Sequence, residues 1–422
     1  MDIKCFLFCS FKFLKNIPMK TIHDLDVKGK QVLVRVDFNV PLDKNFNITD
    51  DTRMQKALPT INNLLVRGAS VILASHLGRP QKDKNEDGSI KVEKYTLNHL
   101  VEHLAELTDA EIVFADNCVG GETELKAERL KPGEILLLEN TRFHEGESKG
   151  DIDLAIKMSR LADIYVNDAF GTAHRAHSST ATVANYFEPE NKALGLLMYS
   201  EIASADKLLK SPKRPVVAIV GGAKVSDKIK LLEKLVEVVN HVCIGGGMAY
   251  TFLKSNGGKI GNSICEDDYM DLAQEILKKA KELGTEIHLP IDTLIADDFA
   301  NDANTKVVLS GETPDGWEGL DIGPKTIEQF SDVIMKAKSI LWNGPMGVFE
   351  FKTFNKGTYG VAQTVAEATK NGAFSLIGGG DSVAAINKAG LADTVSFVST
   401  GGGAMLEYLE GKTLPGIKAI TG

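Results

Sequence analysis

The feature that most constrains the fold of this chain is a regular alternation of short apolar runs with longer amphipathic segments. Each run holds five or six residues and is almost continuously apolar, which is typical of strands buried on both faces of a parallel sheet. We therefore expect two series of strands. They cover 31–36, 70–75, 111–115, 134–139 and 163–168, and then 215–220, 241–246, 286–290, 339–343, 374–379 and 394–399.

Amphipathic segments separate these runs, at 53–68, 152–162, 226–240, 267–283, 326–338 and 356–370. Strand–helix alternation predicts βαβ units and a parallel sheet. We therefore expect an α/β protein with two doubly wound parallel-sheet, Rossmann-like domains joined by a hinge. The expected parts are a domain at 19–190, a hinge or helix at 191–212, a second domain at 213–403 and a C-terminal segment at 404–422.

The first eighteen residues differ from the rest of the chain. They are rich in aromatic residues, Lys12 and Lys15 interrupt their apolar stretch, and no small-residue cleavage site follows, which argues against a secretory signal. Met19 begins a segment that reads as a plausible protein start. We expect 1–18 to be an extension outside the fold, and a targeting segment is the alternative.

Composition excludes several classes of protein. The chain has 422 residues, is 43% apolar and holds 48 Lys and Arg against 57 Asp and Glu. It is too apolar to be disordered, it has no apolar run near the ~20 residues of a membrane span, and its net charge of −9 argues against general nucleic-acid binding. None of its cysteines forms a C-x-x-C pair. We expect neither a disulfide framework nor a zinc site, and a reducing, cytoplasmic compartment.

Polar residues follow the strands of the first series, where open α/β sheets bind their ligands. Arginine recognises phosphate and carboxylate in a planar, bidentate manner, and several arginines at one sheet edge indicate a small, multiply anionic ligand. Each arginine taken alone is more often an ordinary surface group. The candidate residues are Asp37, Asn39, His76, Leu77, Gly78, Arg79, Arg142 and Arg175, with Arg53 at the start of the first helix.

Glycine clusters follow the strands of the second series. Glycine lets backbone N–H groups approach a ligand closely, and a helix N-terminus favours an anion, so these loops predict a nucleotide or polyphosphate site. Tight turns that need glycine are the alternative. Asp381 is either a Mg²⁺ contact or a helix N-cap. The clusters are Gly221–Gly222 with Lys224 and Lys228, Gly245–Gly247, Gly378–Gly380 with Asp381 and Ser382, and Gly401–Gly403.

Three local patterns are decoys. The chain has no G-x-x-x-x-G-K-[ST] loop, because Leu406 stands where the first glycine before Gly411 would be. Gly146–Gly150 matches G-x-S-x-G around Ser148, but no buried strand runs directly into it, as a nucleophile elbow requires. His99 and His103 share one helix face without the glutamate of a zinc-protease motif, so we expect a surface helix there.

These segments resemble the phosphoglycerate kinase family, and they occur in its order over essentially all of 19–422. One small departure is Thr141, where the family often has leucine. The matching segments are RVDFNVPL (35–42), SHLGRP (75–80), LLLENTRF (136–143), NDAFGTAHRAHSS (167–179), GGAKVSDKI (221–229), GGGMAYTFL (245–253), LWNGPMGVFE (341–350), GGGDS (378–382) and STGGGAMLEYLEGKTLPG (399–416).

The resemblance implies the reaction 1,3-bisphosphoglycerate + MgADP ⇌ 3-phosphoglycerate + MgATP, in glycolysis and gluconeogenesis. It implies that the first domain binds the three-carbon substrate through the candidate residues above and that 404–422 packs back on that domain. It also implies a monomer whose partners are these small molecules. The residues implied for the nucleotide are Lys224, Lys228, Gly319, Glu350, Gly379, Gly380, Asp381 and Ser382, with Asp381 near Mg²⁺.

Phosphoryl transfer needs mainly alignment and charge stabilisation from a protein. We expect Arg53 and Lys228 to neutralise the transferring group, and the helix starts at Gly380 and Gly403 to aim N–H groups at it. Transfer is expected to be direct, after hinge closure that excludes water. A hydrolase that uses Ser148 and a catalytically silent binding protein are the rival hypotheses.

Overall fold

The computed structural model describes residues 19–422, which form two compact units. The first unit ends at Ser200 and also takes in Thr413–Gly422, while the second covers Glu201–Lys412. Helix α6 (Leu196–Leu209) contains the boundary between them. The segment 1–18, expected to be an extension, lies outside the described residues.

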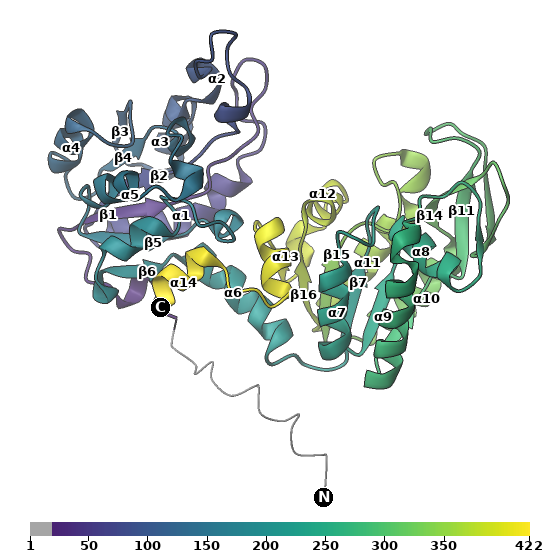
Figure 1. The fold of residues 1–422 in the computed structure, drawn as a ribbon. Coiled ribbons are helices and arrows are strands. Elements are labelled where there is room, and N and C mark those ends of the chain that lie inside the picture. The colour runs from purple at the N-terminus through teal and green to yellow at the C-terminus, as the bar shows by residue number, and fades with distance from the viewer. Residues whose placement is uncertain (1–18) are drawn as a thin grey trace, which may run out of the picture. The chain divides into compact units, whose positions relative to one another are not determined.

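The first unit is built on a parallel sheet of six strands in the order β3-β4-β2-β1-β5-β6 (Figure 1). Its strands are β1 (Gln31–Arg35), β2 (Ser70–Ala74), β3 (Ile112–Ala115), β4 (Ile135–Leu138), β5 (Ile164–Asn167) and β6 (Lys192–Leu194). Its helices are α1 (Thr52–Val66), α2 (Val92–Tyr95), α3 (Val101–Thr108), α4 (Gly121–Glu128), α5 (Ile152–Ser159) and α14 (Pro415–Thr421).

The second unit repeats this design with a six-stranded parallel sheet in the order β10-β8-β7-β15-β16-β17. Its strands are β7 (Val216–Val220), β8 (His241–Ile244), β10 (Glu286–His288), β15 (Ser339–Asn343), β16 (Phe374–Ile377) and β17 (Phe397–Val398). Its helices are α7 (Ile229–Val238), α8 (Met248–Ser255), α9 (Met270–Leu283), α10 (Pro324–Ile334), α11 (Lys356–Lys370), α12 (Gly380–Lys388) and α13 (Gly403–Leu409).

The expected fold class is therefore confirmed, and the physical reason is visible in the burial of the strands. All five residues of β2, of β7 and of β15 are buried, because layers of helices cover both faces of each sheet. A polar residue could not occupy either face of such a strand without a hydrogen-bond partner. This constraint explains the nearly continuous apolar runs of the sequence.

A small antiparallel sheet in the second unit is absent from the sequence-based expectation. It has the strand order β12-β11-β14, and a two-stranded ladder pairs β13 with β9. Strand β12 is largely exposed and β9 and β13 hold two residues each, so none gives the apolar run of a buried strand. The bounds are β9 (Lys259–Ile260), β11 (Asp292–Ala296), β12 (Thr305–Leu309), β13 (Glu312–Thr313) and β14 (Glu318–Ile322).

The end of the chain belongs to the first unit. The amide of Gly416 donates to the carbonyl of Ala173 at 2.8 Å, and the Asn167 side chain donates to the carbonyl of Gly416 at 3.3 Å. A Cβ atom at Gly416 would lie 3.0 Å from Cα of Ala173, so glycine permits this close approach. Helix α13, by contrast, lies in the second unit and packs on α7.

Two further observations apply to the described residues as a whole. Their cysteines, Cys118, Cys243 and Cys265, are free thiols. Across residues 19–422, every helix is too short or too polar to cross a lipid bilayer.

The core of the second unit provides a test of its packing. Ile377 is fully buried and its strand position pairs with Trp342. We expect Ile377→Ala to lower the free energy of unfolding of this unit by about 2–5 kcal/mol, because the lost side-chain atoms leave a cavity. Urea denaturation followed by tryptophan fluorescence measures the change, because both Trp317 and Trp342 belong to this unit. Leu283→Ala, at a residue that is 53% exposed, should change it by less than about 0.5 kcal/mol, and equal losses would contradict the expectation.

Candidate active site

In the first unit, an ion pair joins the end of β1 to the start of α1. Arg53 lies in the first turn of α1, and its guanidinium donates to a carboxylate oxygen of Asp37 at 2.9 Å. The side chain of Asp37 is nearly buried, whereas that of Arg53 is 37% exposed. Asp37 therefore holds Arg53 in place while part of the guanidinium remains free to meet a ligand.

His76, which follows β2, is held as a neutral imidazole. It is buried, and Arg35 donates to its Nδ1 at 3.2 Å. A guanidinium has no acceptor, so Nδ1 must accept and the ring proton lies on Nε2. Burial, and next the charge of Arg35, lower the pKa of His76 well below its usual value. The ring can therefore donate one hydrogen bond from Nε2 without adding charge.

Asn39, Gly78 and Arg142 connect three strand ends. The amide of Gly78 donates to the side-chain oxygen of Asn39 at 2.8 Å, and Arg142 donates to the carbonyl of Gly78 at 2.6 Å. Gly78 has a positive φ of 61°, and a Cβ atom there would collide with the ring of Tyr95. The loop after β2 therefore needs glycine to bring these groups together. Leu77, beside them, is buried in the core of the unit.

Three of the predicted arginines line one pocket with a volume of about 260 Å³. These are Arg79, Arg142 and Arg175, which come from loops after three different strands. Arg53, Asp37 and His76 are not among its lining residues. Ser148, which the sequence analysis considered only as a hydrolase nucleophile, also lines it. Sequence reasoning did not single out the other lining residues, namely Pro80, Gln81, Lys82, His144 and His177.

The electrostatics of this pocket favour an anion. Burial, and next the neighbouring charges of Arg35 and Arg175, lower the pKa of Arg142 to about 10, so the guanidinium remains charged at neutral pH. Burial and the same cations lower the pKa of His177 to about 4, so that ring is neutral. A bound anion offsets the repulsion among these closely spaced positive charges. The pocket is therefore suited to phosphate or carboxylate.

In the second unit, a lysine that follows β7 is hydrogen-bonded to a residue at the carboxyl end of β15. Lys228 precedes α7, and its ammonium donates to the side-chain oxygen of Asn343, the last residue of β15. Asn343 in turn donates to the carbonyl of Gly378 at 3.0 Å. Burial lowers the pKa of Lys228, and the nearby carboxylate of Asp381 opposes that shift. Asn343 thus links the lysine to the glycine loop after β16, a role that sequence reasoning missed.

The glycine loop after β16 leads directly into α12. Gly379 has a φ of 88° and is the N-cap residue of this helix. Asp381 lies in the first turn, is exposed and makes no capping hydrogen bond, so the interpretation of Asp381 as an N-cap is wrong. The buried hydroxyl of Ser382 accepts from the amide of Gly344. The first turn of α12, which contains Gly380, therefore presents its N–H groups and one carboxylate outward.

The remaining predicted residues of the second unit lie on several separate elements and loops. Lys224 and Glu350 are exposed, and Gly403 begins α13. Gly319 lies in β14 and donates to the hydroxyl of Ser263 at 2.9 Å. A Cβ atom at Gly319 would collide with the hydroxyl of Tyr250, so glycine is required there for packing.

A buried glutamate at the start of the second unit was also missed. Glu201 of α6 accepts from the Ser399 hydroxyl and the Thr400 amide, each at 2.7 Å. It thereby anchors the loop that contains Gly401–Gly403. Its sequence separation of 198 residues from Ser399 explains why local patterns did not indicate it.

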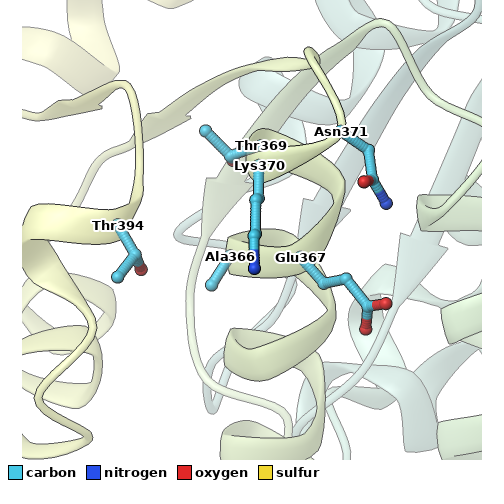
Figure 2. A pocket seen from close by; sticks show the side chains of 6 residues that line it. All are labelled: Ala366, Glu367, Thr369, Lys370, Asn371 and Thr394. Atoms are coloured by element: carbon cyan, nitrogen blue, oxygen red, sulfur yellow. The ribbon is translucent and has the colours of Figure 1, made fainter.

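The decoy patterns are resolved by their surroundings. Ser148 lies in a short 3-10 helix, Glu147–Lys149, and no strand runs into it, so it is not on a nucleophile elbow. His103 is in α3 and pairs with Asp51 at 2.9 Å. A second pocket, with a volume of about 640 Å³, lies beside the end of α11, and its lining includes Glu367, Lys370 and Thr394. Figure 2 shows these side chains. The lining of this pocket holds none of the predicted residues.

These features define a class of protein: an α/β enzyme with one unit suited to a small polyanion and another with glycine loops suited to a nucleotide. The family model for phosphoglycerate kinase matches residues 22–412. The chain is 50% identical to the phosphoglycerate kinase of Porphyromonas gingivalis, over 95% of the chain and all of that relative. It is also 50% identical to a cytosolic phosphoglycerate kinase of Nicotiana tabacum, with 95% and 97% covered.

Solved structures agree with this result. The phosphoglycerate kinase of Coxiella burnetii matches with a TM-score of 0.85 and 40% identity, over 96% of the chain and 99% of that structure. That of Pyrococcus horikoshii matches with a TM-score of 0.78 and 32% identity, over 95% and 98%. The chain belongs to the phosphoglycerate kinase family, and it is a phosphotransferase.

Two buried threonines of the first unit give opposite predictions for stability. Among the described residues, the hydroxyl of Thr141 has no hydrogen-bond partner, whereas that of Thr60 accepts from the Leu196 amide at 2.8 Å. We expect Thr141→Val to raise the free energy of unfolding by about 1 kcal/mol and Thr60→Val to lower it by about 1–3 kcal/mol. Scanning calorimetry measures both, and changes of the same sign would contradict the analysis.

Proposed function

We propose that the arginine-lined pocket of the first unit binds the phosphoglycerate and that the glycine loops of the second unit bind the nucleotide. The chain then performs its phosphoglycerate kinase reaction by moving a phosphoryl group from 1,3-bisphosphoglycerate to ADP. The acyl phosphate bond breaks, a bond to the β-phosphate of ADP forms, and 3-phosphoglycerate leaves as a carboxylate. The observation that carries this proposal is the pocket shared by Arg79, Arg142 and Arg175.

The first unit offers charge and hydrogen bonds to a three-carbon acid phosphate. Arg79, Arg142 and Arg175 can each bind a phosphate or carboxylate in a bidentate manner. Asp37 and Asn39 accept hydrogen bonds and can meet the substrate hydroxyl, and the neutral ring of His76 can donate to an oxygen. We assign Leu77 and Gly78 to the loop that positions these groups, since Gly78 contacts both Asn39 and Arg142.

The second unit offers backbone donors and a few charges to a nucleotide. We assign the phosphates to Lys224, Lys228 and the loop Gly379–Ser382, and the nucleoside to Gly319 and Glu350. Mg²⁺ prefers oxygen ligands and keeps waters and substrate phosphates in its shell. The exposed carboxylate of Asp381, near the Lys228 ammonium, fits such an ion, which would neutralise phosphate charge when bound.

The catalytic residues in this proposal are Arg53 and Lys228, which neutralise the transferring phosphoryl group. The N–H groups at Gly380 and Gly403 add hydrogen bonds to it. Because acceptor and nucleotide belong to different units, turnover requires the units to close around them. Transfer is direct, and a stable phosphoryl-protein formed from labelled ATP alone would contradict this step.

We also propose a cytoplasmic monomer that acts in glycolysis and gluconeogenesis. The described cysteines are free, which suits a reducing compartment. The residues proposed for each ligand lie within one chain, so the reaction needs no second copy.

Arg53 provides the sharpest test of the catalytic assignment. We expect Arg53→Ala to lower kcat by about 10²-fold or more, because one charge contact to the transition state is lost. Mg²⁺-dependent ATP consumption with 3-phosphoglycerate measures it. Affinity for ADP should not change, since Arg53 belongs to the first unit.

Two further variants control this experiment. Arg53→Lys keeps the charge but not the planar geometry and should retain more activity than Arg53→Ala. Arg160→Ala removes an exposed arginine at the end of α5 and should keep the kcat of the natural sequence. A kcat for Arg53→Ala that equals that of Arg160→Ala would overturn the role of Arg53.

Ser148 tests the rival hydrolase hypothesis. It lines the arginine pocket, but it has no role in the proposed phosphoryl transfer. Ser148→Ala is therefore expected to change kcat by less than about 10-fold. Loss of a true serine nucleophile costs on the order of 10⁶-fold. Kinase and esterase assays on the same variant separate the two hypotheses. Kinase activity that persists supports the kinase, whereas a collapse of both activities would favour the hydrolase.

A further inference from the structure

A cluster of two histidines and a glutamate lies at the edge of the second unit's parallel sheet. His241 is the first residue of β8, and Glu286 and His288 belong to the edge strand β10. The register places His241 beside Glu286. Because side chains alternate along a strand, Glu286 and His288 project from the same face of β10, and His241 joins them from the neighbouring strand.

The three side chains already face a common point. The Nδ1 atom of His241 lies 3.2 Å from Nε2 of His288 and 3.2 Å from a carboxylate oxygen of Glu286, and that oxygen lies 3.8 Å from the same Nε2. A triangle with these sides has its centre about 2.0 Å from each corner. Zinc binds imidazole nitrogen and carboxylate oxygen at about 2.0–2.2 Å, so one ion can reach all three atoms without rearrangement.

The donor set selects the class of cation. Imidazole suits zinc, copper, iron and nickel, whereas Mg²⁺ and Ca²⁺ prefer oxygen. Two histidines and one glutamate are a known zinc set that leaves a fourth position for water. Glu286 is 69% exposed and the two histidines 27% and 16%, so an ion bound here keeps one side toward solvent.

Within residues 19–422, the ion pairs of Glu286 are those with His241 and His288. No lysine or arginine pairs with this carboxylate in the described part of the chain.

The cluster is separate from the nucleotide loops. His241 is at the amino end of β8, and the loop Gly245–Gly247 follows the carboxyl end of the same strand. We propose that His241, Glu286 and His288 form a second cation site, specific for zinc-type divalent transition metals, with one coordination position open to solvent. The cysteine spacing that argues against a zinc site does not bear on it, because its ligands are histidine and glutamate.

Titration of the chelator-treated full chain with Zn²⁺ tests this site. We expect one equivalent to bind, and an excess of Mg²⁺ not to displace it. His241→Ala and His288→Ala should each weaken Zn²⁺ binding by at least about 100-fold, since loss of a residue that only supports a ligand costs about 10- to 100-fold. Glu286→Gln should weaken it by about 10-fold or more, because the amide oxygen carries no charge. Co²⁺ in place of Zn²⁺ should give the visible absorption of a four-coordinate site.

His103→Ala is the matched control, because His103 also faces two carboxylates, Asp51 and Glu106, but through its opposite ring nitrogens, Nε2 and Nδ1, which cannot bind one ion together. It should bind Zn²⁺ like the natural sequence. The His241 and His288 variants should keep kinase activity with Mg²⁺. That activity would show that they fold, and it would separate a loss of Zn²⁺ binding from a failure of the proposed function. Unchanged Zn²⁺ affinity in both of those variants, or equal loss in His103→Ala, would overturn the site.

Discussion

Parallel pairing in register is the constraint on which both units depend. Arg35 at the end of β1 pairs with Ala74 of β2 and with Asn167 of β5, so the loops after these strands start at one level. In the second unit, Asn343 pairs with Val220, which brings the end of β15 beside the Gly221 loop. Residues that are far apart in sequence therefore become neighbours, because the carboxyl ends of parallel strands share one edge.

The buried guanidinium of Arg35 organises the edge of the first sheet. It is 1% exposed and donates to Ser179 at 2.8 Å, to the carbonyl of Val36 and to His76. Ser179 in turn donates to the buried Glu147 at 2.5 Å. A buried charge is costly unless it is hydrogen-bonded and compensated. These partners fix the orientation of Arg35, and Arg35 then dictates the protonation of His76, the histidine that follows β2.

Sequence patterns predicted what depends on local chemistry. The buried strands are visible because both faces are apolar. Most candidate residues of the first unit and the glycine loops of the second are visible because they follow those strands, whereas Gly319 and Glu350 were indicated only by the resemblance to the family. Strand β12 escaped detection because it is exposed, and Glu201 because its partners are almost two hundred residues away. Asn343 lay inside a recognised motif, but its link to Lys228 is a property of strand order, which periodicity does not contain.

On the proposed function, the two units would bind their anionic ligands by different physical means. In the first, crowded guanidiniums remain charged because even a lowered pKa of about 10 for Arg142 lies far above neutrality, while His76 and His177 lose their charge. The arginines thus supply fixed positive charge, and the neutral rings of His76 and His177 supply only hydrogen-bond donors and acceptors. In the second, glycine loops and the start of α12 supply N–H dipoles, with Lys228 as a half-buried charge. A small acid phosphate needs directional salt bridges, whereas a long polyphosphate is held by many weaker donors along a loop. On the proposed function, that difference accounts for the division of arginine and glycine between the units.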